Sequence, residues 1–323
     1  MRIVVTGSSG FIGSYLVKRL KDDGYTVVGV DREPGTPDVV DRFVQGDLAQ
    51  EQIRERALDG ADAVMHLAAA KDDWGIDDET FFFENLEVTR RLIADARERG
   101  IHDWVFYSSV AAIGPGDEPR TEKSSLKPSG AYGASKKEAE SLLRAYAEEE
   151  PEVSCIILRP SVVFGPGNFS YTNVYRLIEA VRTNRFLMVG DGQAIKTTSY
   201  IENLIEATMY LWERRSSGVQ TYIYVDEPVR TTGELVDDIY RLLGKTRPGI
   251  HIPLDLAKAV AWISDVAASV TGINFPITAA RIEKFNTSTN YDASAIREAG
   301  FEQPVEIEEA LQKTVNWHLD QVE

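Results

Sequence analysis

Cysteine is almost absent from this chain of 323 residues, in which Cys155 is the single example. One cysteine can form neither an internal disulfide nor a cysteine-based zinc site, which agrees with a reducing compartment. The four histidines are scattered, so a histidine-rich metal centre is not expected either. We therefore expect a protein without a structural or catalytic metal.

Basic residues are in the minority, with 35 lysines and arginines against 51 carboxylates and a formal net charge of -16. A nucleic acid or an anionic membrane would require a basic face, so neither is expected as a partner. Such an acidic surface suits a salt-rich cytoplasm, but acidic proteins also occur in ordinary cells. The composition does not distinguish a protein from a salt-rich cytoplasm from one of an ordinary cell.

Long uncharged hydrophobic runs are also lacking. The most apolar stretch, Leu254 to Ile277, is interrupted by Asp255, Lys258 and Asp265, so it predicts an amphipathic packing helix and not a membrane span. Met1 leads directly into a predicted core strand, which leaves no room for a signal peptide. We expect a cytoplasmic protein that has no membrane partner.

What the sequence does contain is a strand, a glycine-rich turn and a helix at its start. A strand is predicted over Arg2 to Thr6, and an amphipathic helix begins near Phe11. Between them, Gly7 suits a tight turn with positive φ, Gly10 lets the backbone approach a pyrophosphate, and Gly13 lets the helix pack closely on the strand. Glycines also serve ordinary turns, so this motif needs support from its context.

Two charged residues supply that context. A second predicted strand, Thr26 to Val30, ends at Asp31, where a dinucleotide-binding fold places the carboxylate that bonds the adenine ribose. Asp31 therefore favours NAD over NADP. Arg32 follows directly and could instead meet a 2′-phosphate, so NADP remains the second possibility.

Strands and helices then alternate through the first half of the chain, which predicts an α/β fold: a Rossmann-type, doubly wound parallel sheet. We expect residues 1–165, rejoined by about 196–227, to form this dinucleotide-binding domain. Residues 166–195 and 228–323 are expected to form a smaller, mostly helical C-terminal substrate lobe. The predicted elements are strands over 63–67, 104–108, 154–158 and 221–225, and helices over 79–98 and 131–148.

Three polar residues form the candidate catalytic set. Tyr132 and Lys136 are four apart on a predicted helix and leave from one face, and Ser109 follows a predicted strand. A phenol is a poor base at neutral pH, but a nearby ammonium favours its anion. Tyr132 could then take a proton from a substrate hydroxyl, Lys136 would lower its pKa, and Ser109 would hold the substrate oxygen.

With these residues assembled, the chain resembles the extended short-chain dehydrogenase/reductase family, in its NAD-dependent epimerase/dehydratase branch, which acts mainly on nucleotide sugars. The resemblance implies a homodimer formed through the two long helices. For the substrate it implies contacts from Asn85, Ser109, Asn168 and Lys196. For NAD it implies contacts from Gly7, Ser9, Gly10, Phe11, Ile12, Asp31, Arg32, Asp47, Leu48, Leu67, Ala68, Ala69, Tyr132, Lys136, Pro160 and Val162.

Departures from the family pattern narrow the chemistry. Val110 and Ala111 stand where family dehydratases carry an acidic pair, which disfavours dehydration. Lys196 stands where an arginine commonly binds the diphosphate of the substrate; it is a phosphate ligand or a surface lysine. Ile113 and Val162 replace the usual tyrosine and asparagine, so no particular sugar is indicated.

The leading hypothesis is an NAD-dependent nucleotide-sugar epimerase of the UDP-sugar 4-epimerase type, which works by transient oxidation at C4 with Tyr132 as base. The same three catalytic residues would also serve a 4-keto-sugar reductase or another NAD(P)-dependent alcohol dehydrogenase. An apolar lobe containing Trp262, Phe275 and Phe285 would suit a hydrophobic hydroxy compound. A third reading is a non-catalytic NAD-sensing or scaffold protein on the same fold, which the intact catalytic set disfavours.

Overall fold

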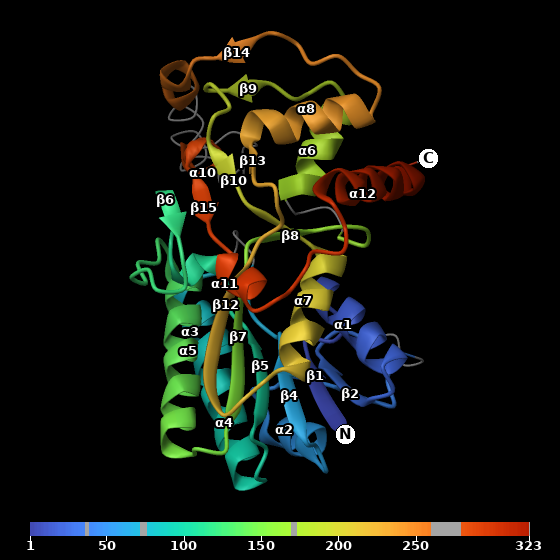
Figure 1. Cartoon of the computed structure of the whole chain (residues 1–323), viewed down its shortest axis with the longest axis vertical. Coiled ribbons are helices and arrows are strands. Elements are labelled where there is room, and N and C mark those ends of the chain that lie inside the picture. Colours follow the sequence, from blue (N-terminus) through green and yellow to red (C-terminus); the bar gives the residue numbers. More distant parts are fainter. Residues whose placement is uncertain (36–38, 72–75, 169–172, 260–278, 323) are drawn as a thin grey trace.

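A seven-stranded parallel sheet forms the centre of the molecule (Figure 1). The computed structural model describes residues 1–35, 39–71, 76–168, 173–259 and 279–322. The strand order is β12-β7-β5-β4-β1-β2-β3, and every neighbouring pair is parallel. The strands are β1 (Arg2–Thr6), β2 (Thr26–Asp31), β3 (Arg42–Gln45), β4 (Ala63–His66), β5 (Asp103–Tyr107), β7 (Ser154–Pro160) and β12 (Gly218–Tyr224). The predicted Rossmann-type fold is confirmed.

Helices cover both faces of this sheet, which explains why its strands are apolar on both sides. Along β1, Ile3 and Val5 pack into one core cluster and Val4 into the other. The first cluster includes α1 (Phe11–Asp22) and α7 (Ile201–Glu213), and the second includes α2 (Glu51–Leu58), α4 (Val88–Glu98) and α5 (Ala131–Glu149). Figure 1 shows α1 and α5 on opposite sides of the sheet. Full burial of each such side chain stabilises the fold by roughly 1.5–3 kcal/mol.

The helix predicted over 79–98 is not one regular α-helix. It consists of α3 (Asp78–Phe82), a π-helical turn (Phe83–Glu87) and α4. Apolar spacing does not distinguish a π turn from an α turn, so the sequence pattern does not predict this π turn. Asn85 lies in the middle of the wide turn and is buried, and π turns are often found at functional sites.

Two further elements of the sheet domain are absent from the prediction. In β3, Val44 is the only fully buried residue, so the strand carries no apolar run. In α2, charged residues surround the few apolar ones, and the helix is only 8 residues long. Short and mostly polar elements are held by pairing and packing, which a local pattern does not reveal.

The remaining part of the chain forms the smaller lobe at the top of Figure 1. Its helices include α6 (Asn173–Arg182), α8 (Thr232–Leu242) and α12 (Ile307–Val322), together with a four-stranded sheet in the order β13-β10-β15-β6. In that sheet β6 (Gly116–Arg120) comes from the first half of the chain, whereas β10 (Ile195–Lys196), β13 (Arg230–Thr231) and β15 (Thr289–Tyr291) come from the second. The division of the chain into two domains at residue 165 stays a prediction.

No helix in the described ranges has both the length and the apolar character needed to cross a membrane. The amphipathic helix expected over 254–277 lies from residue 260 onward outside the described residues, as do Trp262 and Phe275.

The chain returns to the sheet domain through β11 (Thr198–Tyr200) and α7. Here the buried Asp226 carboxylate accepts hydrogen bonds from the Tyr200 amide at 2.5 Å and the Asn203 side chain at 3.0 Å.

Candidate active site

The glycine-rich turn between β1 and α1 is as tight as the sequence predicts. Gly7 has a φ of 69°, in the left-handed region that disfavours side chains. A Cβ atom added at Gly13 would lie 2.0 Å from the Gly7 carbonyl oxygen, so only glycine allows α1 to approach the turn this closely. The Gly7 backbone also touches the loop after β4, because a Cβ there would lie 2.9 Å from the Ala68 amide nitrogen.

The N-terminus of α1 has the properties of an anion site. Its N-cap residue is Gly10, no side chain caps the helix, and its first turn has no acidic residue. The amides of the first turn and the helix dipole are therefore left to an external acceptor. The nearby Ser8 hydroxyl is buried and has no hydrogen-bond partner within the described residues. A diphosphate fits this donor set.

Carboxylates surround the end of β2. Asp31 accepts hydrogen bonds from the Ser9 amide at 2.9 Å and from the Glu33 amide at 3.1 Å, so it ties the glycine-rich turn to β2. Arg32 forms ion pairs with Asp47, at 3.1 Å, and with Glu84. Because two carboxylates pair with this one guanidinium and Asp31 is its neighbour in the sequence, a 2′-phosphate would meet net negative charge here. The arrangement favours a ribose with free hydroxyls, as in NAD.

Ser109 and the start of α5 lie close together. Ser109 follows β5 and caps a short 3₁₀ turn (Val110–Ala112), since its Oγ accepts a hydrogen bond from the Ala111 amide at 3.1 Å. A Cβ added at Gly133 would lie 2.2 Å from the Ala111 carbonyl oxygen, so α5 packs directly on this turn. Tyr132 precedes Gly133 and contacts the Phe81 ring edge-on, with the centroids 6.0 Å apart. The predicted catalytic helix and serine therefore meet.

Lys136 is buried behind Tyr132, with 2% of its surface exposed. Its ammonium donates a hydrogen bond to the Tyr107 carbonyl oxygen at 2.9 Å and lies 4.9 Å from the centroid of the Phe106 ring. Burial lowers the pKa of Lys136 to about 8, and the nearby Glu140 carboxylate opposes that shift. At neutral pH the ammonium form still dominates, so the site contains a cation.

A buried polar chain that the sequence did not predict lies behind the glycine-rich turn. The Thr89 hydroxyl donates to the Asn85 carbonyl at 2.7 Å, so it must accept from His66 Nε2, which is 2.9 Å away. His66 Nδ1 then accepts from the Thr6 hydroxyl at 2.7 Å, and Thr6 Oγ1 accepts from the amides of Leu67 and Ala68 at 3.1 Å each. Burial lowers the pKa of His66 to about 3, so the ring is neutral and each bond has one direction.

The same chain continues to the catalytic helix through Asn85. Its side-chain amide donates to the Ala70 carbonyl and to Ser135 Oγ, both at 3.0 Å, and its oxygen accepts from the Ala70 amide at 2.8 Å. Ser135 donates to the Tyr132 carbonyl at 2.8 Å. Asn85 is 1% exposed and its donors are occupied, so these contacts favour a structural role. Its contact with substrate stays a prediction.

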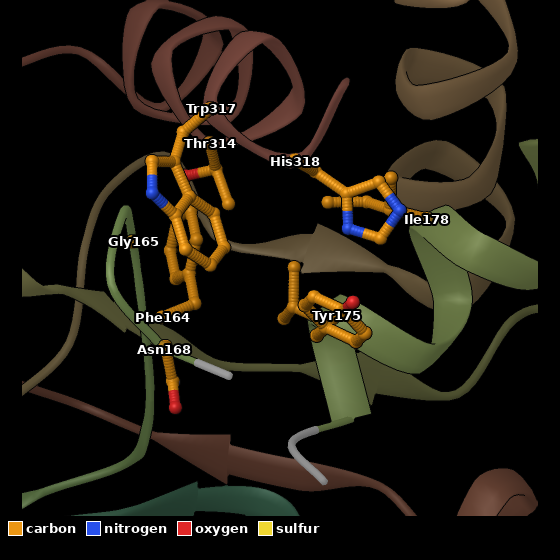
Figure 2. A pocket seen from close by; sticks show the side chains of 9 residues that line it. Phe164, Gly165, Asn168, Tyr175, Ile178, Thr314, Trp317 and His318 are labelled. Atoms are coloured by element: carbon orange, nitrogen blue, oxygen red, sulfur yellow. The ribbon is translucent and has the colours of Figure 1, made fainter. Parts of the chain in front are cut away.

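The other two predicted substrate residues lie in or beside the smaller lobe. Lys196, on β10, donates to the Thr287 carbonyl oxygen at 2.6 Å. Asn168 donates to the Val163 carbonyl at 3.0 Å and forms one end of a narrow crevice whose opposite end holds His318 (Figure 2). The amide oxygen of Asn168 points away from His318. The walls of this crevice include none of the three catalytic candidates, and both substrate roles stay predictions.

The remaining residues predicted to contact NAD lie at or near the carboxyl ends of the central strands, as expected for a parallel sheet. Leu48, which follows β3, is largely buried in the core, and its adenine contact stays a prediction. The others are placed as follows: Ser9, Gly10, Phe11 and Ile12 at the start of α1, Asp47 after β3, Leu67, Ala68 and Ala69 after β4, Pro160 at the end of β7, and Val162 at the start of β8 (Val162–Phe164).

Comparison with known proteins decides the family. Residues 3–225 match the sequence profile of the family described as "NAD dependent epimerase/dehydratase family". The chain belongs to this family. The match spans the whole central sheet and the catalytic candidates, so the resemblance inferred from the motifs is confirmed. The fold and the family together make the chain an enzyme of the epimerase/dehydratase class.

Relatives of this family member include both epimerases and reductases. An N-acetyl-alpha-D-glucosaminyl-diphospho-ditrans,octacis-undecaprenol 4-epimerase from Escherichia coli O157:H7 is 30% identical over 98% of this chain and 95% of its own length. A putative dihydroflavonol 4-reductase from Synechocystis is 28% identical over 97% and 93%. The solved structure of MoeE5 in complex with UDP-glucose and NAD superposes with a TM-score of 0.79, at 26% identity and full coverage of both chains.

Proposed function

We propose that this enzyme is an NAD-dependent 4-epimerase of sugars carried on a diphosphate, with a UDP-sugar as the substrate. The observation that carries the proposal is the placement of Ser109, Tyr132 and Lys136 around one strand end, next to an uncapped helix N-terminus that fits a diphosphate. A 4-epimerase relative aligned over nearly the whole chain and a solved neighbour in complex with UDP-glucose and NAD support it.

The residues divide the chemistry between them. The Lys136 ammonium stabilises the phenolate form of Tyr132, and this phenolate takes the proton of the C4 hydroxyl and becomes the neutral phenol. Ser109 Oγ already accepts the Ala111 amide, so its hydrogen is free to point at the substrate oxygen and hold it in place. Bound NAD supplies a reversible acceptor for the hydride at C4. When the sugar presents its other face, the same residues run these proton steps in reverse.

The surroundings of Ser109 disfavour dehydration. The residues that follow it form an apolar 3₁₀ turn in which Val110 is 8% exposed and Ala112 is fully buried. No acid or base is present at these positions to remove the C5 proton and expel the C6 hydroxyl. The proposal is therefore redox-neutral inversion at C4 without loss of water.

A second candidate is a reductase of a 4-keto sugar or another ketone. The observation in its favour is the reductase from Synechocystis, which matches this chain over nearly its full length. The site itself accommodates both reactions, because a reductase uses the same three residues in one direction only. The fate of the cofactor distinguishes the two functions.

We expect the purified protein to release NAD or NADH in near-stoichiometric amount on gentle denaturation, measured by absorbance and mass spectrometry. An epimerase recycles its cofactor and has no need to exchange it. If a sugar diphosphate is released with it, its mass would identify the group that the diphosphate links to the sugar. This group is either a nucleoside or a polyprenol, as in the name of the Escherichia coli relative. A cofactor-free protein that binds NAD(P)H only reversibly would contradict the epimerase and favour the reductase.

We also propose a homodimer in the cytoplasm. Phe82 and Phe83, at the junction of α3 and the π turn, are 37% and 42% exposed, which is high for large apolar side chains. Helices α3 and α5 pack against one another, so these rings lie beside the helices through which family members are expected to pair. Light scattering of the purified protein gives the mass that decides this point.

A further inference from the structure

A buried carboxylate lies one helical turn beyond Lys136. Glu140, on α5, is 1% exposed, and its oxygens accept hydrogen bonds from Ser108 Oγ at 2.5 Å and from Arg159 Nε and Nη2 at 2.8 and 2.5 Å. Arg159, on β7, is itself 1% exposed. Burial of such a pair is costly unless its geometry is good, and the bidentate contact supplies that geometry.

This ion pair is continuous with the catalytic helix and strand. Tyr132, Lys136 and Glu140 are spaced four residues apart on α5, so they form one stripe along the helix. Lys136 bonds the Tyr107 carbonyl and Glu140 bonds the Ser108 hydroxyl, which are the two residues immediately before Ser109. Two successive turns of α5 therefore hold the strand end that carries Ser109.

The pair also determines the charge beside Tyr132. Glu140 and Arg159 neutralise each other, which leaves Lys136 as the net cation, and Glu140 alone would favour the charged form of Lys136. Of the neighbouring ionisable groups, His66 and Cys155 are neutral because burial moves their pKa values to about 3 and about 12. The groups that face Lys136 and Glu140 are Arg144 on α5, with Nη2 3.7 Å from Glu140, Arg159 and Cys155 on β7, His66 on β4 and Tyr107 on β5.

We propose that Glu140, clamped by Arg159, is a positioning residue of the active site that fixes Ser109 against α5 and balances the charge that stabilises the Tyr132 phenolate. The proposal rests on the proposed role of Tyr132 as base, but it does not depend on which substrate the enzyme takes. It assigns a function to the buried residues Ser108, Glu140 and Arg159, which take no direct part in the proton steps.

Charge balance predicts opposite effects for the two halves of the pair. In Glu140→Gln, Arg159 is left uncompensated, so the coupled Tyr132 and Lys136 groups should lose their protons at lower pH. In Arg159→Met, Glu140 loses its bidentate partner and keeps only the partly exposed Arg144, at 3.7 Å, as a counter-charge. The added negative charge should make both groups hold their protons to higher pH. The double variant removes both charges and should titrate near the wild type.

The test is an alkaline titration of tyrosinate absorbance, with each variant measured against the same variant carrying Tyr132→Phe, so that the difference reports Tyr132. We expect the midpoint to move by about one unit downward in Glu140→Gln and upward in Arg159→Met. Ser108→Ala should lower kcat several-fold and leave the midpoint in place, because it removes positioning without changing charge. The titration uses no substrate, so it stays informative if the substrate assignment fails.

A matched control is Asp95→Asn, which breaks a partly buried ion pair, Arg54 to Asp95 at 2.5 Å, between α2 and α4. It should lower thermal stability and leave the Tyr132 midpoint and kcat unchanged. If one of the two single variants does not fold, the other alone still tests the proposal, because the expected direction of its midpoint shift is stated for each. Unmoved midpoints, or shifts in the same direction, would show that the pair only stabilises the fold and would overturn the proposal.

Discussion

Replacing Tyr132 by phenylalanine is expected to reduce kcat/KM by between about a hundredfold and ten-thousandfold, the range typical of a lost general acid–base group. The phenol oxygen takes the substrate proton, and among the described residues no other ionisable side chain is placed to replace it beside Ser109 and Lys136. The ring contact with Phe81 remains in the variant, so folding should be little affected. Initial rates with a UDP-sugar measure the effect.

The matched control is Tyr146→Phe on the same helix. Tyr146 donates to the Ile101 carbonyl at 3.2 Å, on the core side of α5, so its loss should cost about 1 kcal/mol of stability and leave turnover intact. Both variants should keep their bound NAD, because neither alters the turn between β1 and α1. Turnover in Tyr132→Phe close to that of the wild type would refute its role as the base.

Replacing Gly13 by alanine should abolish cofactor binding and lower stability by about 1–3 kcal/mol. The added Cβ would lie 2.0 Å from the Gly7 carbonyl oxygen and 2.9 Å from the Ser8 Cα, both backbone atoms that cannot rotate away. The helix must then move off the turn, and its N-terminal amides move with it. Mass spectrometry of the purified variant and its thermal unfolding measure the two effects.

Gly249→Ala is the control for this variant. No atom lies within 4 Å of a Cβ placed at Gly249, and its φ is outside the left-handed region, so alanine fits there. We expect unchanged stability and full occupancy with NAD in this control. Retention of NAD by Gly13→Ala would mean that the turn is not the diphosphate site.

Local patterns in the sequence were sufficient for several elements that carry candidate site residues. The strand predicted over Arg2 to Thr6 has those bounds in the structure, and the helix predicted over 131–148 is α5, Ala131–Glu149. Both are strongly periodic and buried on one or both faces, which is the signal that a local pattern contains. The tight turn at Gly7 could also be predicted, because glycine alone adopts its φ without strain.

The contacts that support the site could not be predicted in the same way. His66 meets Thr6 and Thr89 across 60 and 23 residues of sequence, and Glu140 meets Ser108 across 32. Such pairs depend on the order of strands in the sheet, which single-sequence periodicity does not give. Asn85 is an example: its hydrogen bonds to Ala70 and Ser135 could not be predicted from the sequence, and its contact with substrate stays a prediction.

The most direct test of the account follows the hydrogen at C4. A UDP-sugar deuterated at C4 is mixed with unlabelled sugar diphosphate of different mass, and the products are analysed by mass spectrometry and NMR. We expect an inverted C4 that keeps its deuterium on the same molecule, with no NADH released and no label in solvent. Accumulation of a 4-keto product with stoichiometric NADH, or no inversion with any sugar diphosphate, would contradict the assignment as a 4-epimerase.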